Sequence, residues 1–302
     1  MGLNKKGYVV PKVAFVILHF GDATVTKRCI ESLDNLIDSD SISIIVVDNE
    51  LTKPAESRTC RATFFRQDDK RGHYIRIEED GGFSYANNTG YGYARDILKA
   101  DIIVVTNNDI EFIQDDFLIK VISIAQLGEY DVIGPDTIQA TTKKHQNPMA
   151  LKAPSLKEVE KTIFLNSIAL NFYSISYPIL SRCEKERSYV VVNDALESNA
   201  SIENVVLFGA CLIFLPNFVL NEAKAFEPET HFYYEEFLLF RKCQRMQYRT
   251  AFVPSLSVIH ESGKSTDTSY ANKRSNLHFR MSNILASAKI YHEYLKQNGI
   301  ID

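Results

Sequence analysis

The sequence is poor in several features by which proteins are quickly classified. It has no Trp, and its 302 residues include only five cysteines. The cysteines are odd in number and widely scattered, and none forms a CxxC pair, so neither a disulfide framework nor a zinc ribbon is expected. We therefore expect a cytoplasmic protein in a reducing compartment. The five are Cys29, Cys60, Cys183, Cys211 and Cys243.

Positive charge is not in excess either. The chain has 34 Lys and Arg against 38 Asp and Glu, a formal net charge of −4. Broad binding to nucleic acid depends on a basic surface, so we expect no nucleic-acid partner, whereas a small phosphorylated ligand is compatible with this charge. The segment from Met1 to Lys12 lacks the apolar core of a secretory signal peptide, and we expect no such signal.

Long apolar runs are also missing, and no segment is predicted to span a membrane. The nearest is the uncharged run 162–180, which two Asn, three Ser and Pro178 interrupt. It is at the short end of what a transmembrane helix needs. We interpret the run as a buried or partly buried helix and loop. The alternative is an interfacial surface near a membrane or a lipid-linked acceptor, with the protein peripheral at the inner face of the membrane.

What the first third of the chain does contain is an alternation of apolar runs and helical patterns. The apolar runs are rich in β-branched residues, as in strands that are buried on both faces. Their alternation with helices predicts an α/β fold with a mainly parallel sheet, and ligands of such sheets bind beyond the carboxyl ends of the strands. The predicted strands are Val13–Phe20, Ile42–Val47, Tyr74–Ile77 and Ile102–Thr106, and a helix is predicted over Ala86–Leu98.

The rest of the chain continues as one domain with a helical tail. Its length allows two domains or one large α/β domain, and no repeat or low-complexity linker divides it. Charged and amphipathic patterns predict helices over Phe117–Leu127, Leu156–Lys161, Glu235–Met246 and, in the tail, Arg274–Lys296. Strand patterns cover Val205–Leu215, Thr250–Pro254 and Ser257–His260.

Polar side chains end three of the predicted strands, namely His19, Asp48 and the triplet Asn107-Asn108-Asp109. A carboxylate at the position of Asp109 could bind a divalent cation that also contacts a diphosphate, whereas the alternative is an ordinary turn residue. Asp48 could accept hydrogen bonds from a base or a ribose. Because both carboxylates are expected at one edge of the sheet, we favour a functional interpretation for the pair.

Further candidate site residues follow the aromatic cluster His231–Tyr234 and the strand predicted over Ser257–His260. Glu235 and Glu236 begin a predicted helix, where adjacent carboxylates either complement the helix dipole or supply a general base. His260 ends a strand and precedes the segment Glu-Ser-Gly-Lys-Ser-Thr. The flexible backbone, hydroxyl groups and Lys264 of that segment are compatible with a diphosphate.

Taken in this order, the segments resemble the family 2 glycosyltransferases with the GT-A fold, especially bacterial rhamnosyltransferase-like members that build surface polysaccharides. The resemblance covers residues 12–266. It is carried by VAFVILHFGDATVTKRCIESL at the start, IIVVDNE around Asp48, GGFSYANNTGYGYA from Gly81, the Asn-Asn-Asp triplet, VIGP, QNP, FGACLIF, and the long segment from Tyr233 to Thr266.

The resemblance implies a GT-A, Rossmann-like fold in which residues 1–112 form the nucleotide-sugar-binding half. Residues 113–266 would form the metal- and acceptor-binding half, and 267–302 a helical C-terminal tail. Glu236 stands in the place of the catalytic aspartate of the family, next to Glu235 as a second candidate. The implied nucleotide-binding residues are Phe20, Asp48, Gly82, Phe83, Asn88, Asn107 and Lys264, and the implied metal ligands are Asp109 and His260.

The function that the resemblance implies is inverting, metal-dependent transfer of a sugar. The donor would be a dTDP- or UDP-sugar, with rhamnose favoured, and the metal Mn²⁺ or Mg²⁺. The acceptor would be a hydroxyl group of a growing surface polysaccharide or a lipid-linked glycan. Two alternatives remain: a non-catalytic subunit that binds a nucleotide sugar, and a nucleotidyltransferase, which shares strand-end carboxylates and a metal.

Overall fold

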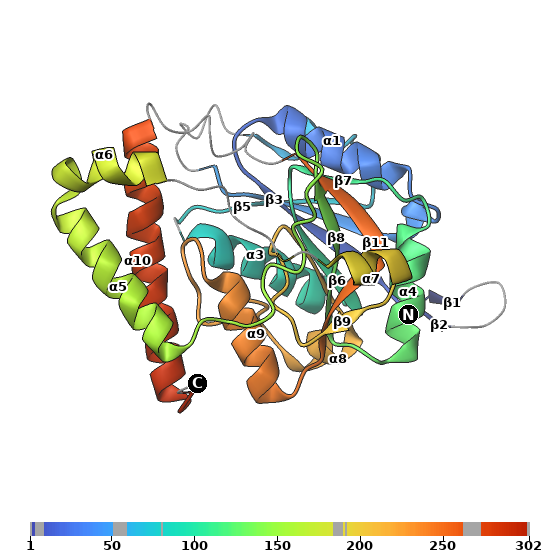
Figure 1. The fold of residues 1–302 in the computed structure, drawn as a ribbon. Coiled ribbons are helices and arrows are strands. Elements are labelled where there is room, and N and C mark those ends of the chain that lie inside the picture. The colour runs from blue at the N-terminus through green and yellow to red at the C-terminus, as the bar shows by residue number, and fades with distance from the viewer. Residues whose placement is uncertain are drawn as a thin grey trace.

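A curled nine-stranded sheet forms the centre of the molecule (Figure 1). The structure is a computed structural model that describes residues 2–3, 9–50, 59–79, 81–183, 190, 192–261 and 273–300, and the elements named below are those of this part of the chain. The sheet order is β5-β4-β3-β6-β10-β8-β11-β7, with β9 paired to β11. Its strands are β3 (Val13–His19), β4 (Ser43–Asp48), β5 (Gly72–Arg76), β6 (Ile102–Asn107), β7 (Ile110–Phe112), β8 (Val132–Gln139), β9 (Ile202–Glu203), β10 (Cys211–Phe214) and β11 (Thr250–His260).

The first half of the sheet, β5-β4-β3-β6, is parallel throughout. His19 lies opposite Asp48, and Leu18 lies opposite Asn107. The carboxyl ends of β3, β4 and β6 therefore coincide, and the polar residues that end them share one edge. This confirms the predicted α/β fold and the common edge.

The second half of the sheet is mixed. Strand β10 is antiparallel to both β6 and β8, and β11 is parallel to β8 but antiparallel to β7 and β9. Of the strand predicted over Val205–Leu215, only Cys211–Phe214 pairs as a strand, and 205–210 is a buried connection. The two strands predicted at 250–260 are one strand with a register shift between Val253 and Ser257, beside Pro254, which has no N–H group for pairing.

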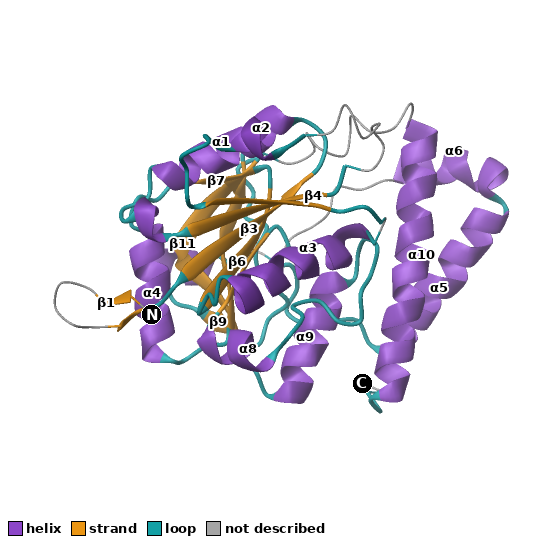
Figure 2. Ribbon diagram, turned by 180° about the vertical axis from the view of Figure 1, so that it is seen from behind, coloured by secondary structure: helices purple, strands orange, loops and turns teal. Residues whose placement is uncertain are grey.

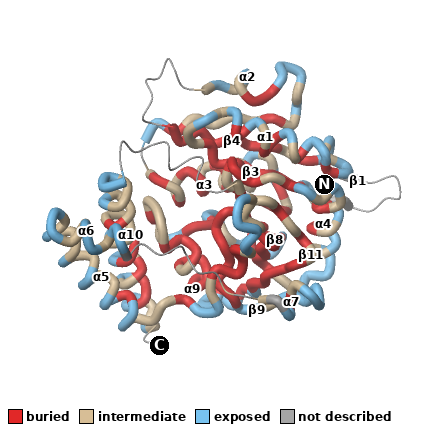
Figure 3. The backbone as a smooth tube through the Cα atoms, turned by 45° about the horizontal axis from the view of Figure 1, so that its top comes forward, coloured by how far each residue is buried: buried red, intermediate tan, exposed pale blue. Residues whose placement is uncertain are grey.

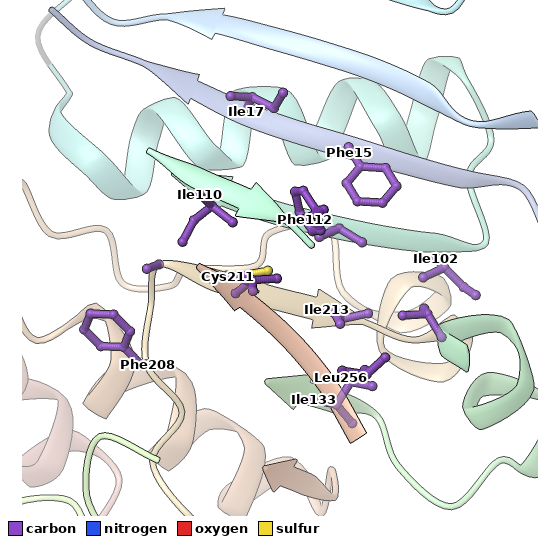
Figure 4. Packing of buried hydrophobic residues seen from close by; sticks show 14 of the residues in the cluster. Phe15, Ile17, Ile102, Ile110, Phe112, Ile133, Phe208, Cys211, Ile213 and Leu256 are labelled. Carbon is purple, nitrogen blue, oxygen red and sulfur yellow. The ribbon is translucent and has the colours of Figure 1, made fainter. Parts of the chain in front are cut away.

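Apolar side chains cover both faces of the sheet. Along β3, Val13, Phe15 and Ile17 join one buried cluster, while Ala14, Val16 and Leu18 join the other, as the two-residue period of a strand requires. In the first cluster, the rings of Phe15 and Phe112 meet edge to face at 5.3 Å (Figure 4). This double burial explains why the strands are continuous apolar runs in the sequence.

Helices pack around the sheet on both sides (Figure 2). The helices predicted over Phe117–Leu127 and Glu235–Met246 have the expected bounds. The helix predicted over Ala86–Leu98 begins instead at Gly82 and continues as a π-helical segment, Tyr93–Ile97. Two strands near the N-terminus, β1 (Gly2–Leu3) and β2 (Val9–Val10), form a separate ribbon. The helices that flank the sheet are α1 (Ala23–Asp34), α2 (Arg61–Phe64), α3 (Gly82–Gly92), α4 (Phe117–Leu127), α7 (Asn193–Ser198), α8 (Pro216–Asn221) and α9 (Glu235–Met246), with a 3-10 turn at Ser39–Ser41.

Three more helices stand together at one side of the molecule in both ribbon views (Figures 1 and 2). They are α5 (Leu156–Asn171), α6 (Tyr173–Cys183) and the long C-terminal helix α10 (Lys273–Gln297), which confirms the predicted tail helix. A capping box between Ser155 and Glu158 starts α5.

The apolar run at 162–180 departs from our preferred interpretation. It forms most of α5 and α6 rather than a helix and a loop, and the two helices are bent by 118° at their junction. Only Val159 of α5 is buried, and six large apolar side chains between Phe164 and Ile179 are exposed. The run is therefore partly buried, as that interpretation allowed, but helices stand where a loop was expected and the outer faces are exposed. Among the described residues no single helix has the length and apolar character to cross a membrane, whereas α5 and α6 together reach that length and composition.

Candidate active site

Asp48, at the end of β4, is a buried and hydrogen-bonded carboxylate. Tyr74 donates from its hydroxyl at 2.6 Å, Thr59 donates at 2.8 Å, and the backbone N–H of Glu50 donates at 2.9 Å. Burial by itself would raise the pKa of Asp48, but these three bonds and the neighbouring His19 outweigh it and lower that pKa. Asp48 is therefore held as an anion at the edge where nucleotide binding is predicted.

The turn after β6 brings Asp109 next to His260. Strand β7 pairs antiparallel with β11 so that Ile110 lies opposite His260, and this places Asp109 Oδ1 3.3 Å from His260 Nε2. The other ring nitrogen, Nδ1, lies 2.7 Å from Gln146 Oε1. Asp109, His260 and Gln146 are all buried. The sequence predicted both Asp109 and His260 as ligands of one metal, and the structure places them in contact.

Asn108, the middle residue of the triplet, fixes the turn from inside. Its amide nitrogen donates to the backbone carbonyl of Phe20 at 3.1 Å and to Thr26 Oγ1 at 3.0 Å. Thr26 Oγ1 also lies 2.7 Å from Nδ1 of the buried His19. The ends of β3 and β6 and the start of α1 are thus joined by one polar network.

The two glutamates at the start of α9 point toward different parts of the molecule. Glu235 lies 3.4 Å from the hydroxyl of Thr230, which in turn contacts Ser84 in α3. Glu236 lies against Gly209, because a Cβ atom at Gly209 would come within 3.0 Å of Glu236 Oε1. Both carboxylates are buried in the first turn of α9.

The segment Phe208–Ala210 connects the glutamate to the Asp109–His260 pair. The backbone carbonyl of Ala210 accepts a hydrogen bond from the N–H of Asn107 at 2.9 Å. The ring of Phe208 lies 5.7 Å from the ring of His260. Gly209 between them adjoins Glu236. One short connection therefore contacts the metal-side pair and the candidate base at the same edge of the sheet.

Two predicted nucleotide-binding residues, Gly82 and Phe83, lie at the start of α3. Gly82 has φ +71°, and a Cβ atom there would lie 2.4 Å from the backbone of His231, so both the turn and the close approach require glycine. The N–H of Phe83 donates to the carbonyl of His231 at 2.7 Å. These two residues thus position the chain that leads into α9.

Asn88, also predicted to contact the nucleotide, is engaged with the segment before α9. Its amide nitrogen donates to the carbonyl of Phe226 at 2.7 Å and to Glu229 Oε1 at 3.0 Å, and its oxygen accepts from the N–H of Phe226 at 3.0 Å. The geometry favours a positioning role for Asn88. Phe20 and Asn107 are half-exposed at the strand edge, and Lys264 lies outside the described residues.

The Asp109–His260 pair is the candidate site for the divalent metal that the family resemblance implies. The described residues contain no group of three or more His, Cys, Asp or Glu side chains that could hold a metal. Asp109 and His260 supply one carboxylate and one imidazole. Mg²⁺ and similar ions in nucleotide enzymes are commonly held by one or two carboxylates together with substrate phosphates. The pair therefore fits a metal that binds jointly with a diphosphate.

For several residues of the site, the sequence predicted no function. Gln146 and Gly209 lie in motifs that carried the resemblance, but nothing local indicated that one contacts His260 and the other makes room for Glu236. Tyr74 and Thr59 contact Asp48 across strands and loops that are distant in the sequence. Each contact depends on the folded chain, so the sequence carried no usable signal for it.

Residues 15–184 match the model of Glycosyl transferase family 2. The matched segment is more than half of the chain. The chain belongs to this family. No curated protein matches the sequence significantly. The glycosyltransferase prediction is confirmed at this level, and the rhamnosyltransferase-like subtype stays a prediction.

Solved structures of glycosyltransferases share the fold. GalNAc-T7, crystallised with UDP, GalNAc and Mn²⁺, is similar with a TM-score of 0.57 and 11% identity, over 83% of this chain and 44% of that one. Residues 1–349 of S. aureus TarS are similar with a TM-score of 0.52 and 8% identity, over 92% of this chain and 71% of that one. The family 2 protein thus spans less than half of the GalNAc-T7 chain. At these identities the likeness shows the GT-A-like fold alone.

Proposed function

We propose that this family 2 enzyme is an inverting glycosyltransferase that moves a sugar from a nucleotide-diphosphate donor to a hydroxyl group of a glycan. The observation that carries the proposal is the meeting of Glu236 and the Asp109–His260 pair at Phe208–Ala210. Sugar transfer needs a base for the acceptor and a charge-stabilising group for the departing diphosphate. Glu236 is a candidate for the first and the Asp109–His260 pair for the second, at the strand edge where ligands of such sheets bind.

Glu236 is the residue that we assign as the base. It would take the proton from the acceptor hydroxyl while that oxygen forms a bond to the anomeric carbon and the bond from that carbon to the diphosphate oxygen breaks. Attack from the face opposite the diphosphate inverts the configuration. Glu236 faces the segment that touches His260, whereas Glu235 faces Thr230 and α3, and this difference favours Glu236 over its neighbour.

Asp109 and His260 would hold a divalent metal such as Mn²⁺ or Mg²⁺, which supplies positive charge for the diphosphate as it leaves. Gln146 orients the imidazole by its contact to Nδ1, so Nε2 is directed toward Asp109. Asp48 would bind the base or ribose of a uridine or thymidine donor. Rhamnose as the sugar, and a growing surface polysaccharide or lipid-linked glycan as the acceptor, come from the family resemblance.

A thermal-shift screen of nucleotide-diphosphate sugars, with and without Mn²⁺, tests the donor half of the proposal. We expect one donor class to raise the melting temperature, and Mn²⁺ to increase the shift, because a ligand that binds only the folded state stabilises it. No response to any donor would contradict the proposal.

The variant Glu236→Gln tests the base, with Glu235→Gln as its matched control. We expect Glu236→Gln to lower the release of nucleoside diphosphate by about 100-fold or more while the donor-induced thermal shift persists. Unchanged turnover in this variant would exclude Glu236 as the base. Donor binding without product in the wild type would favour a non-catalytic subunit, and release of pyrophosphate would favour a nucleotidyltransferase.

A further inference from the structure

We propose that the outer face of α5 and α6, together with the first half of α10, is a docking surface for an anionic lipid bilayer. We call it the basic apolar face. It consists of six exposed apolar side chains between residues 164 and 179 and of the basic residues in the segments 161–183 and 273–285. The apolar members are Phe164, Leu165, Ile168, Phe172, Ile175 and Ile179, which are between 45% and 73% exposed.

The apolar members form two stripes that meet at the bend. Phe164 and Ile168 are four residues apart in α5, and Ile175 and Ile179 are four residues apart in α6. Phe172 lies at the junction between the two helices. Such spacing places side chains on one side of a helix. Both helices are drawn largely in the colours of intermediate and exposed residues in Figure 3.

The inner sides of the same helices are already used. Val159 is buried and Ile163 is packed against the core, while Tyr173 contacts His278 of α10 with ring centres 4.8 Å apart. A helix that is apolar on its outer side as well as its inner side is typical of one with a second apolar partner. Large exposed apolar patches on soluble proteins mark contact sites for proteins or membranes.

The charge around the stripes identifies the partner. The segments 161–183 and 273–285 contain no Asp or Glu, although the whole chain has more acidic than basic residues. Their basic residues are Lys161, Arg182, Lys273, Arg274 and Arg280. The guanidinium of Arg274 lies over the rings of Tyr173 and Tyr177, at 5.8 and 5.4 Å from their centres. Basic residues beside an apolar stripe are the composition of surfaces that lie on anionic membranes.

The same charges argue against a second copy of the chain as the partner. A twofold interface brings the same patch of each copy together, so it would oppose basic residues with basic residues and offer no acidic ones. An anionic bilayer instead provides apolar chains for the stripes and phosphates for the cations. In Figure 2, β4 runs toward the side of the molecule on which α6 and α10 stand, so the strand edge and these helices lie on the same side.

Vesicle flotation of the full chain tests the proposal without any donor or acceptor, so its outcome is independent of the proposed reaction. We expect binding to vesicles of phosphatidylcholine with about one third phosphatidylglycerol, and little binding to phosphatidylcholine alone. Each basic residue near an anionic surface raises the binding affinity about fivefold. Because salt screens this attraction, raising the salt concentration should weaken binding.

Two sets of variants locate the surface. Phe164→Ser, Ile168→Ser and Ile175→Ser combined should lower binding by about 100-fold or more, whereas Leu127→Ser and Leu220→Ser, at side chains 69% and 75% exposed elsewhere, should not change it. Lys161→Glu with Arg182→Glu should lower binding to anionic vesicles by about 25-fold or more, whereas Lys27→Glu with Lys70→Glu should have little effect.

Three outcomes would overturn the proposal. The first is equal binding to neutral and anionic vesicles, and the second is unchanged binding by both sets of variants. The third is a wild-type dimer in sedimentation velocity that becomes a monomer in the triple serine variant, because a second copy would then cover the face. The charge-reversal pair changes only exposed side chains, so it remains informative if the serine variant folds poorly.

Discussion

The substitution Gly209→Ala tests whether Glu236 acts from the position in which the fold holds it. A methyl group at Gly209 would lie 3.0 Å from Oε1, 3.2 Å from Cγ and 3.3 Å from Cδ of Glu236. Contacts this short force the neighbour to move by a few tenths of an ångström. The glutamate is the flexible partner of this contact, so its carboxylate is displaced while the fold persists.

The size of the effect follows from that displacement. A misplacement of 1 Å in a catalytic group costs about 100-fold in rate, so a few tenths of an ångström predicts a loss of about 3- to 10-fold in kcat. Donor affinity should not change, because the added methyl group contacts Glu236, which is assigned to the acceptor and not to the donor. The free energy of unfolding should fall by about 1 kcal/mol, as expected for mild overpacking.

The assay is the release of nucleoside diphosphate under saturating donor, compared between wild type, Gly209→Ala and the matched control Gly92→Ala. Nothing lies within 4 Å of a Cβ atom at Gly92, which is helical, so we expect unchanged activity and slightly higher stability there.

A double-mutant cycle gives the refutation. If Gly209→Ala acts through Glu236, it should cause no further loss in a Glu236→Gln background. An equal loss in both backgrounds, or full activity of Gly209→Ala, would show that our account of the base is wrong.

Three further predictions concern the rest of the site. His260→Ala and Gln146→Ala should each raise the Mn²⁺ concentration needed for half-maximal donor stabilisation, the latter by about 10- to 100-fold, and an unchanged response of His260→Ala would exclude it as a ligand. Tyr74→Phe should lower the free energy of unfolding by about 1.5–3 kcal/mol near pH 7. The pKa of Asp48 is lowered from 3.8, so the stability that its ionised form contributes is present above that pH and is lost as the pH falls through the lower folded value. The Tyr74→Phe difference in urea unfolding should therefore shrink in acid, and a pH-independent difference would contradict this assignment. Asn88→Ala removes three hydrogen bonds to Phe226 and Glu229 and should cost about 2–4 kcal/mol in urea unfolding with the donor affinity of the folded enzyme retained.

Local patterns determined much of the architecture. The apolar, β-branched runs at Val13 and Ile102 became central strands because burial on both faces selects that composition. Amphipathic spacing fixed the bounds of α4 and α9. The polar residues His19, Asp48 and Asn107 were expected at one edge because parallel strands align their carboxyl ends, and the register confirms it.

Pairings between distant segments could not be predicted from local patterns. The antiparallel insertion of β10 between β6 and β8 joins segments about a hundred residues apart, and no propensity encodes such a partner. Asn88 appeared as part of a nucleotide motif, yet its amide is bonded to Phe226 and Glu229, which lie far along the chain.

The sequence by itself determined that this protein is an α/β glycosyltransferase of family 2, and it identified Asp48, Asp109, Glu236 and His260 as residues worth attention. Only the tertiary structure decided that Asp109 meets His260, because that contact depends on the register of β7 against β11. It also decided that the apolar run at 162–180 has an exposed face, since composition records how apolar a helix is but not which neighbours cover it.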